Sequence, residues 1–245
     1  MAPATPDGTV TAMAEPRRFP QLRFTAPPGA ADILLIRHGQ SQPAVEDQLF
    51  PLRDGHGDPP LSELGRRQAE RLGRRLSRAP IAAIYVSTLQ RTAQTAAPMA
   101  EALGLRPTVE PDLREVFLGE WEGGQYRQKM AEGDPVGVRA IAEERWDVIP
   151  GAEPSEAFAR RVRGALTRIA AAHPDQVVAC VAHGGVIGQA LAMATGSRPF
   201  AFLGVDNAAI SRLVVTADQW VLRSFNDTSH LDELEEPAPV DPAHT

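Results

Sequence analysis

Two apolar runs that each end in a histidine place the strongest constraint on the fold. Residues 33–38 read ILLIRH, residues 177–183 read VVACVAH, and a glycine follows each histidine. Apolar runs of this length fit strands that are buried on both faces of a sheet. Parallel strands of an α/β fold end at a common carboxyl edge, where such folds bind their ligands. We therefore expect His38 and His183 to lie close together at that edge.

The remaining pattern alternates between stretches of strand length and helical periodicity. The predicted strands are 32–37, 81–86, 107–110 and 176–182, and the predicted helices are 62–78, 89–103, 155–172 and 185–195. This alternation is typical of an α/β fold with a mostly parallel sheet sandwiched by helices. The later stretch AISRLVVTADQWVLRSFN, residues 209–226, predicts two strands about a short turn, and hence an antiparallel hairpin at the sheet edge.

We predict one domain, residues 31–230, between two tails. Residues 1–30 are rich in Ala, Pro and Thr and indicate a flexible N-terminal tail, and residues 231–245 form an acidic, Pro-rich C-terminal tail. Two long inserts, 42–60 and 120–153, interrupt the domain. Loops of that length are usually functional or disordered, and both leave the neighbourhood of the suspected chemistry.

Charge and cysteine content narrow the class of protein. The net charge of −6 is concentrated in residues 227–245, which carry six acids and no Lys or Arg, so residues 31–226 are nearly neutral. A nucleic-acid-binding protein would show a basic excess there. The single cysteine, Cys180, excludes a disulfide within the chain and favours a reducing, cytoplasmic setting. No apolar stretch approaches the roughly 18 residues that span a bilayer, which indicates no membrane association.

The segment RRQAERLGRRLSR, residues 66–78, contains six arginines and is the exception to that neutrality. Apolar residues recur at helical spacing through it and just before it, at Leu61, Leu64, Leu72 and Leu76. The arginines mostly fall elsewhere around the helix. We interpret them as the solvated face of an amphipathic helix rather than as a nucleic-acid site.

Two further segments place charged residues at the ends of predicted elements. Arg91 lies in the first turn of a helix that Ser87 or Thr88 can cap, where a cation is unfavourable unless an anion binds nearby. Glu115 lies in LREVFLGEWEGG, a segment rich in glycine. Arg91 could instead be a surface arginine, and the His-Gly-Gly turn at 183–185 could be only a helix entry. Together, two histidines, two arginines and one glutamate indicate a cationic pocket with a proton donor, suited to phosphoryl transfer without a metal or cofactor.

These segments resemble the histidine phosphatase superfamily, in its phosphoglycerate mutase-like branch (branch 1). The matching motifs are RHG at 37–39, STLQRTAQTA at 87–96, LREVFLGEWEG at 113–123, HG at 183–184 and PLSELGRRQA at 60–69. Each motif alone is common. Their order over most of residues 33–185 makes the resemblance specific.

The resemblance implies a role for each matching residue. His38 would attack phosphorus and form a phosphohistidine, while a backbone carbonyl holds its other ring nitrogen. Arg37, Arg91 and His183 would bind the phosphoryl oxygens, and Glu115 would protonate the leaving oxygen. Three further residues are implied in substrate binding: Gln40, Ser41 and Gly184.

The chain also departs from the family pattern. Family members commonly have a phosphate-binding asparagine six positions after the nucleophile, where this chain has Ala44, and Gln40 replaces a frequent glutamate. We interpret His56 as a surface loop residue, although it could reach the pocket from its insert. Trp121 and Trp146 could line a substrate pocket, and Trp121 fits the core equally well.

Three functions are compatible with these residues. The leading hypothesis is a phosphomonoesterase that acts on a small phosphorylated metabolite. The resemblance also allows a phosphoglycerate mutase, but mutases carry extra basic residues after the glutamate segment, and here residues 120–138 offer only Arg127 and Lys129. Because Ala44 replaces the phosphate-binding asparagine of the family, the third hypothesis is a non-catalytic phospho-ligand-binding module. The sequence is compatible with a homodimer and contains no feature that requires one.

Overall fold

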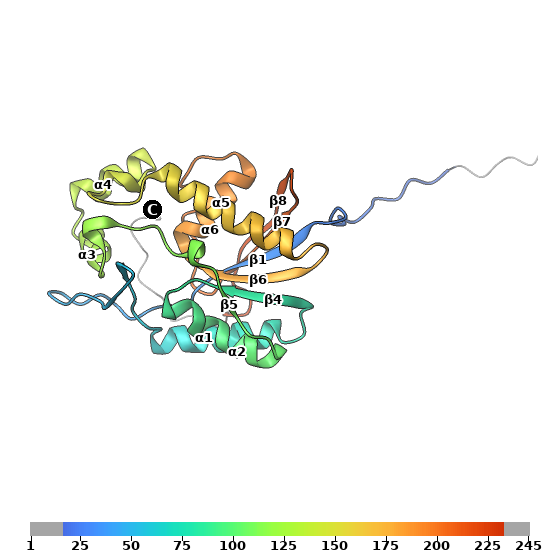
Figure 1. Cartoon of the computed structure of the whole chain (residues 1–245), viewed down its shortest axis with the longest axis horizontal. Helices are drawn as coiled ribbons and strands as arrows, with labels where there is room; N and C mark the ends of the chain where they lie inside the picture. Colours follow the sequence, from blue (N-terminus) through green and yellow to red (C-terminus); the bar gives the residue numbers. More distant parts are fainter. Residues whose placement is uncertain (1–16, 233–245) are drawn as a thin grey trace, which may run out of the picture.

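A six-stranded sheet forms the centre of the protein in a computed structural model that describes residues 17–232 (Figure 1). The strands follow the order β5-β4-β6-β1-β7-β8. Their bounds are β1 Ala31–Arg37, β4 Ile81–Val86, β5 Thr108–Val109, β6 Val177–Ala182, β7 Ile210–Val215 and β8 Trp220–Asp227. Strands β5, β4, β6 and β1 are parallel, whereas β7 runs antiparallel to both β1 and β8. The predicted mostly parallel sheet with a C-terminal antiparallel hairpin at its edge is confirmed.

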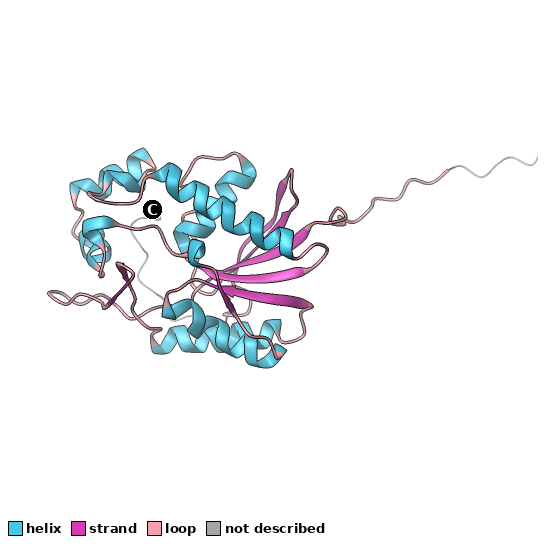
Figure 2. Ribbon diagram, viewed as in Figure 1, coloured by secondary structure: helices cyan, strands magenta, loops and turns pink. Residues whose placement is uncertain are grey.

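Helices cover both faces of the sheet (Figure 2). Helices α1 Glu63–Leu76 and α2 Gln90–Leu103 form one layer, and α5 Ser155–Ala172 and α6 Gly184–Thr195 form the other. In β1, Ile33 and Leu35 belong to the core beneath α5 and α6, whereas Ile36 belongs to the core beneath α1 and α2. Because side chains alternate along a strand, a strand covered on both faces needs apolar residues throughout. This requirement explains the continuous apolar run before His38.

Helix α1 is amphipathic, as predicted. Ser62 caps its start by accepting a hydrogen bond from the Gly65 backbone N–H. Ala69, Leu72 and Leu76 are buried, the two leucines in the core cluster that includes Ile36 of β1, and most of the arginines of this helix are exposed to solvent. The arginine-rich stretch is therefore a solvated helix face.

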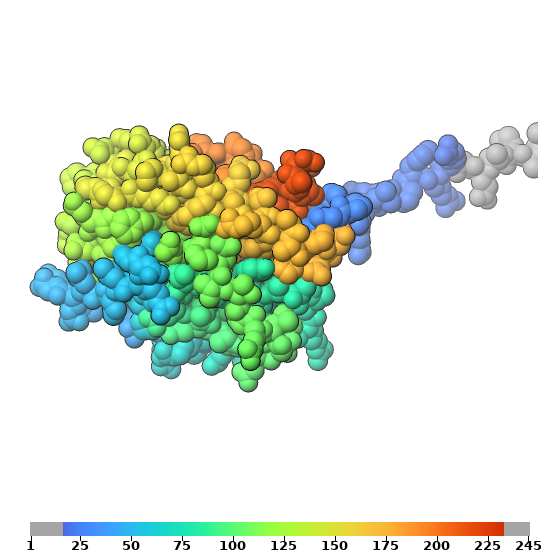
Figure 3. Space-filling model, in the orientation of Figure 1, coloured from blue at the N-terminus to red at the C-terminus, as the bar shows by residue number. Residues whose placement is uncertain are grey.

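The two inserts contain regular structure, contrary to the expectation of long loops. Insert 42–60 forms a small hairpin of β2 Leu52–Arg53 and β3 His56–Gly57, and insert 120–153 contains α3 Gln125–Ala131 and α4 Pro135–Glu143. Three short 3-10 helices complete the described elements: η1 Pro111–Leu113, η2 Gly119–Trp121 and η3 Trp146–Val148. The Phe50 N–H donates to the Gly123 carbonyl at 2.8 Å, so the inserts lie side by side (Figure 3). Both inserts stay near His38 and Arg91, at the carboxyl edge of the sheet.

The predicted tails fall largely outside the described residues, which begin at 17 and end at 232. Residues 17–30 contain no helix or strand. Within residues 17–232, no helix combines the length and the apolar character needed to cross a membrane.

Candidate active site

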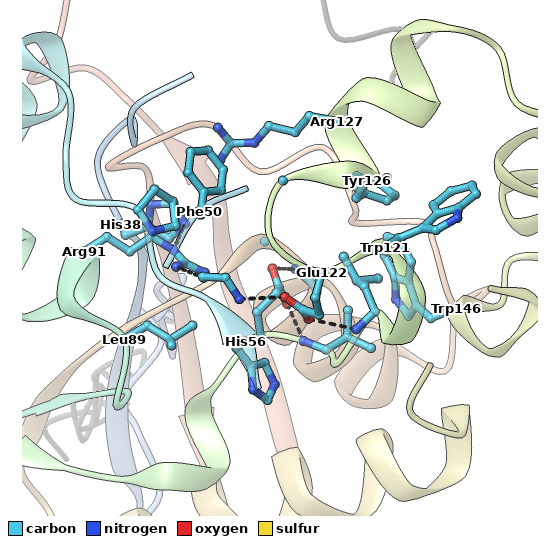
Figure 4. A pocket seen from close by; sticks show the side chains of 18 of the residues that line it. His38, Phe50, His56, Leu89, Arg91, Trp121, Glu122, Tyr126, Arg127 and Trp146 are labelled. Atoms are coloured by element: carbon cyan, nitrogen blue, oxygen red, sulfur yellow. Dashed lines mark hydrogen bonds between the residues drawn. The ribbon is translucent and has the colours of Figure 1, made fainter. Parts of the chain in front are cut away.

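A pocket with a volume of about 280 Å³ opens at the carboxyl edge of the sheet, between the strand ends and the two inserts (Figure 4). Arg37 and His38 reach it from the end of β1, Arg91 from the start of α2, and Glu115 from the loop after η1. His183, at the end of β6, contacts the His38 ring with 5.1 Å between centroids. The structure thus brings together all five residues that the sequence predicts to be catalytic.

His38 is held in one tautomer. Its Nδ1 atom lies 2.7 Å from the Gly39 carbonyl oxygen, which can only accept, so Nδ1 carries the proton. The Nε2 atom then has a lone pair, toward which Arg91 Nε donates at 3.2 Å. A nucleophile requires such a lone pair. Nε2 is therefore the atom of His38 that can attack phosphorus.

Glycines allow α1 to approach the segment that carries His38. A Cβ atom on Gly65 would lie 1.9 Å from the Gln40 carbonyl oxygen, and one on Gly39 would lie 2.6 Å from the Gly65 carbonyl oxygen. Gln40 is tied to the same helix, because Ser62 Oγ donates to its side-chain oxygen at 2.8 Å and its backbone N–H donates to Gln68. This packing fixes the backbone on which His38 stands.

Two guanidinium groups flank His38. Arg91 is buried, and its Nη1 atom donates to the Gly57 carbonyl at 3.0 Å. Burial lowers the pKa of Arg91 to about 10, while the negative charges of Glu115 and Asp58 oppose that shift, so Arg91 stays charged at neutral pH. Arg37 donates to the Val205 carbonyl and packs against Gly184. Paired guanidinium groups are well suited to the oxygens of a phosphoryl group.

His183 is fully buried at the start of α6. Its Nε2 atom lies 2.8 Å from Ser87 Oγ, at the end of β4. Its Nδ1 atom is buried and has no hydrogen-bond partner among the described residues. Such an atom is rare in a folded protein and has hydrogen-bonding capacity to offer a ligand. The sequence suggests Ser87 as a helix cap, but the N-cap of α2 is Leu89, without a side-chain hydrogen bond, and the Ser87 hydroxyl instead orients His183.

Glu115 is anchored by backbone N–H groups. Its Oε1 atom accepts from Val116 at 2.9 Å, and its Oε2 atom accepts from Gly185 at 3.2 Å. A Cβ atom on Gly185 would lie 2.5 Å from Oε1, so glycine is required there for the carboxyl group to reach the pocket. The carboxyl group lines the pocket together with His38, where it can exchange protons with a bound ester.

The three predicted substrate-binding residues take different places. Gly184 lines the pocket beside Arg37. Gln40 and Ser41 do not line it; they line a shallower cavity next to it, and the Ser41 hydroxyl accepts from Arg127 at 2.7 Å. The structure therefore places Gly184 in the pocket with His38, and it places Gln40 and Ser41 in the neighbouring cavity.

The interpretation of His56 as a surface loop residue is wrong. Its side chain is buried, packs edge-on against Phe117 at 5.3 Å between centroids, and lines the pocket. Trp121 and Trp146 line the pocket and are also part of the core. Sequence reasoning did not identify Phe50, Glu122, Tyr126 or Arg127 as pocket residues. All four belong to the inserts, whose position no motif predicted.

Glu122 links the hairpin of the first insert to Arg91. Its carboxylate accepts from the Gly57 N–H at 2.7 Å and from the Leu118 N–H at 2.9 Å. The carbonyl of the same Gly57 holds Arg91. Glu122 therefore positions Arg91 through a single residue, Gly57.

We expect Glu122→Gln to raise KM for a phosphomonoester by roughly tenfold, because the amide offers one acceptor oxygen for two N–H donors. Steady-state kinetics would measure the change, and Glu120→Gln, at an exposed neighbouring carboxylate, is the matched control. Equal KM values for the two variants would refute this positioning role.

Burial lowers the pKa of His38 and of His183 well below the usual 6.5, and the charge of Arg91 lowers both further. In the unfolded chain both histidines bind protons near pH 6.5, so below that pH the unfolded state holds more protons than the folded state. Stability must then decrease as the pH falls.

We expect the free energy of unfolding to fall below pH 6.5 by about 1.4 kcal/mol per pH unit for each of these histidines, until the folded-state pKa is reached. Denaturant unfolding at pH 7.5, 6.5 and 5.5 would measure it. The slope should be shallower in His38→Gln and in His183→Gln, and an unchanged slope in both variants would disprove the account.

Two arginines and a histidine whose Nε2 atom carries a lone pair lie together at the carboxyl edge of the sheet, an arrangement suited to the oxygens of a phosphoryl group. The sequence matches the histidine phosphatase superfamily (branch 1) over residues 33–228, and the chain belongs to this family.

Some of the proteins similar to this chain are named as phosphoglycerate mutases, and others as phosphatases. Phosphoglycerate mutase-like protein 4 of Arabidopsis thaliana is 32% identical over 83% of this chain and 88% of its own length. Phosphoserine phosphatase 1 of Hydrogenobacter thermophilus is 33% identical over 82% of this chain and 95% of its own length. The structure of a mycobacterial glucosyl-3-phosphoglycerate phosphatase is 29% identical, with a TM-score of 0.68 over 81% of this chain and 100% of that one.

Proposed function

We propose that the protein is a metal-independent phosphomonoesterase that hydrolyses a small phosphorylated metabolite through a phosphohistidine intermediate. The observation that carries the proposal is the fixed tautomer of His38. Its Nδ1–H is committed to the Gly39 carbonyl, which leaves the Nε2 lone pair between arginine side chains. The names of the family members similar to this chain support phosphate-ester chemistry.

In the first step, His38 Nε2 attacks phosphorus and forms an N–P bond while the ester P–O bond breaks. The leaving oxygen takes a proton from Glu115. In the second step, the Glu115 carboxylate accepts a proton from water as the water oxygen attacks phosphorus and the N–P bond breaks. Orthophosphate leaves, and both residues return to their initial states.

Arg37, Arg91 and His183 bind the phosphoryl oxygens throughout. The pKa of Arg91, at about 10, keeps its charge in place at neutral pH, and the unpartnered Nδ1 atom of His183 is available to a third oxygen. Fixed cationic groups in a water-poor site stabilise the charge that spreads over these oxygens in the transition state.

Independence from metal ions follows from the charge of the site. Guanidinium groups already surround the position of the phosphoryl group, and a dication placed among them would be repelled. Activity that is unchanged by EDTA is the expected result.

A phosphoglycerate mutase is the second candidate, because three of the similar proteins carry that name in some form. Of the two basic residues within 120–138, Arg127 lines the pocket, whereas Lys129 pairs with Asp134 at 3.3 Å and does not line it. A single additional cation favours release of the phosphoryl group to water over its retention on a doubly phosphorylated ligand.

Phosphate release from a panel of phosphomonoesters in the presence of EDTA tests the proposal. Turnover with free orthophosphate as product supports a phosphatase. Isomerisation of 3-phosphoglycerate without phosphate release would establish the mutase, and absence of both activities would favour a phospho-ligand-binding module.

We further propose a cytoplasmic setting, since Cys180 is the only cysteine and it is buried.

A further inference from the structure

The Glu115 carboxyl group stands on a segment that has no regular structure of its own. Residues 114–118 connect η1 to η2 and form neither helix nor strand. One of the two N–H groups that anchor the carboxyl group belongs to Val116, which moves with the same segment. A general acid must nevertheless be held close to the leaving oxygen, and a displacement of about 1 Å can cost two orders of magnitude in rate. The backbone of this segment must therefore be fixed from outside it.

Arg161, in α5, holds this backbone through three carbonyl groups. Its Nη1 atom donates to the Asp112 carbonyl at 2.8 Å and to the Arg114 carbonyl at 2.7 Å. Its Nη2 atom donates to the carbonyl of Glu115 itself at 2.8 Å. Because a guanidinium group is planar and rigid, three carbonyl groups bound to it keep fixed positions relative to one another and to α5.

Glu153 fixes the other side of the segment. Its carboxylate accepts from Arg161 Nε at 2.7 Å and from Nη2 at 2.8 Å, in a bidentate pair. Its backbone N–H donates to the Phe117 carbonyl at 2.9 Å, and its Oε2 atom accepts from the Phe117 N–H at 3.4 Å. The backbone around Glu115 is therefore held by Arg161 on one side and by Glu153 on the other.

Neither member of this ion pair lines the pocket. Each side chain is only 16% exposed, and the Arg161 guanidinium carbon lies 4.7 Å from the centre of the Phe158 ring. The charge of Arg161 also lowers the pKa of His183, though less than the charge of Arg91 does. Arg161 can thus affect the reaction in two ways, through the segment that it holds or through its charge.

We propose that Arg161 is a positioning residue for Glu115: its fork holds the segment so that the carboxyl group lies where the leaving oxygen of the ester needs a proton. The proposal rests on the phosphatase function above and deepens it. Val116 and Gly185 orient the carboxyl group locally, whereas Arg161 sets the place of the whole segment relative to α5. Loss of the fork should therefore impair proton transfer and leave binding of the phosphoryl group intact.

The first test compares two esters of nearly the same shape, phenyl phosphate and p-nitrophenyl phosphate. Phenolate needs a proton as it leaves far more than nitrophenolate does, so a displaced acid should affect the two esters unequally. For Arg161→Met we expect kcat/KM to fall by roughly tenfold or more with phenyl phosphate, and by a clearly smaller factor with p-nitrophenyl phosphate. Arg160→Met is the matched control, because Arg160 is the exposed neighbour that pairs with Glu156. Equal losses with both esters would overturn the proposal.

A double-mutant cycle with Glu115→Gln distinguishes positioning from a general structural defect. Once the acid is removed, a residue that acts only through it has nothing left to position. Arg161→Met should therefore lower kcat/KM for phenyl phosphate by less than about twofold in the Glu115→Gln background. A loss as large as the one in the wild-type background would refute the positioning role.

Arg161→Lys separates the fork from the charge. Lysine keeps the positive charge but has one donor nitrogen in place of three, so it cannot hold the three carbonyl groups and Glu153 in the same geometry. We expect the same unequal losses in this variant, smaller than in Arg161→Met. Wild-type rates in Arg161→Lys would assign the effect to charge and overturn the proposal. This variant also carries the test if Arg161→Met does not fold.

Amide hydrogen exchange of Gly185 gives a readout that does not need turnover. This N–H donates to Glu115 Oε2 at 3.2 Å, so its exchange rate reports whether the carboxyl group is in place. We expect exchange to be about tenfold faster in Arg161→Met and unchanged in Arg160→Met. If no phosphomonoester is hydrolysed, the proposed function fails, while exchange still tests the positioning role. If hydrolysis is robust and the exchange rate is the same in Arg161→Met as in the wild type, the phosphatase function stands and the role of Arg161 is refuted.

Discussion

Replacing His38 with alanine is expected to lower kcat/KM for phosphomonoester hydrolysis by about four orders of magnitude or more. Without the imidazole no N–P bond can form, and Arg37, Arg91 and His183 can only orient the ester. Phosphate release measured with wild type and variant at equal concentration gives the ratio. His173→Ala is the matched control, because His173 binds Tyr85 and Gln176 and does not line the pocket.

The His38→Ala protein should still bind orthophosphate, since both arginines remain. That binding shows that the variant is folded and that its loss of activity is chemical. Residual activity above about one hundredth of the wild-type value would rule out His38 as the nucleophile.

Glu115→Gln should produce the second-largest loss, and its size should depend on the leaving group. For an alkyl phosphate we expect kcat/KM to fall by about 10²–10⁴-fold, because an alkoxide needs a proton as it leaves and the amide cannot provide one. For p-nitrophenyl phosphate the fall in kcat/KM should be smaller, since nitrophenolate is a stable anion.

The second step should remain slow in this variant with either ester, because activation of water also requires the carboxylate. Stopped-flow absorbance should therefore show a burst of nitrophenolate equivalent to one enzyme molecule, followed by slow turnover. Glu120→Gln is the control and should resemble the wild type. An equal loss for both esters, with no burst, would contradict the acid and base roles of Glu115.

Much of the central fold could be predicted because burial on both faces leaves a direct mark on the sequence. The strand predicted at 81–86 and the helix predicted at 155–172 have those bounds in the structure. The run before His38 reads as a doubly buried strand because the helix layers lie against both faces of β1. The convergence of Arg37, His38, Arg91, Glu115 and His183 then follows from parallel strands that end at one edge.

The rim of the pocket could not be predicted, because it depends on contacts between distant segments. His56 is buried because its hairpin folds back onto Phe117. Arg127 reaches the pocket because α3 packs on the segment that follows His38. No periodicity or motif encodes either contact. Glu122 belongs to a motif that the sequence displays, yet its role requires the position of the Gly57 peptide.

Glycines let helices α1 and α6 pack closely against the groups of the site. Gly39 and Gly65 permit the backbone contact between α1 and the nucleophile segment, and Gly185 leaves room for the Glu115 carboxyl group. Any larger side chain at these positions would move a reacting group. Preorganisation of this kind keeps reacting groups at fixed distances before the substrate arrives.

Trapping the phosphoenzyme tests the central claim most directly. Glu115→Gln would be mixed with p-nitrophenyl phosphate, quenched in alkaline denaturant, digested and analysed by mass spectrometry. The account predicts one phosphoryl group on the peptide that contains His38, sensitive to acid and lacking in a His38→Ala/Glu115→Gln double variant. Nitrophenolate release without a phosphorylated peptide, or phosphorylation at another residue, would contradict it.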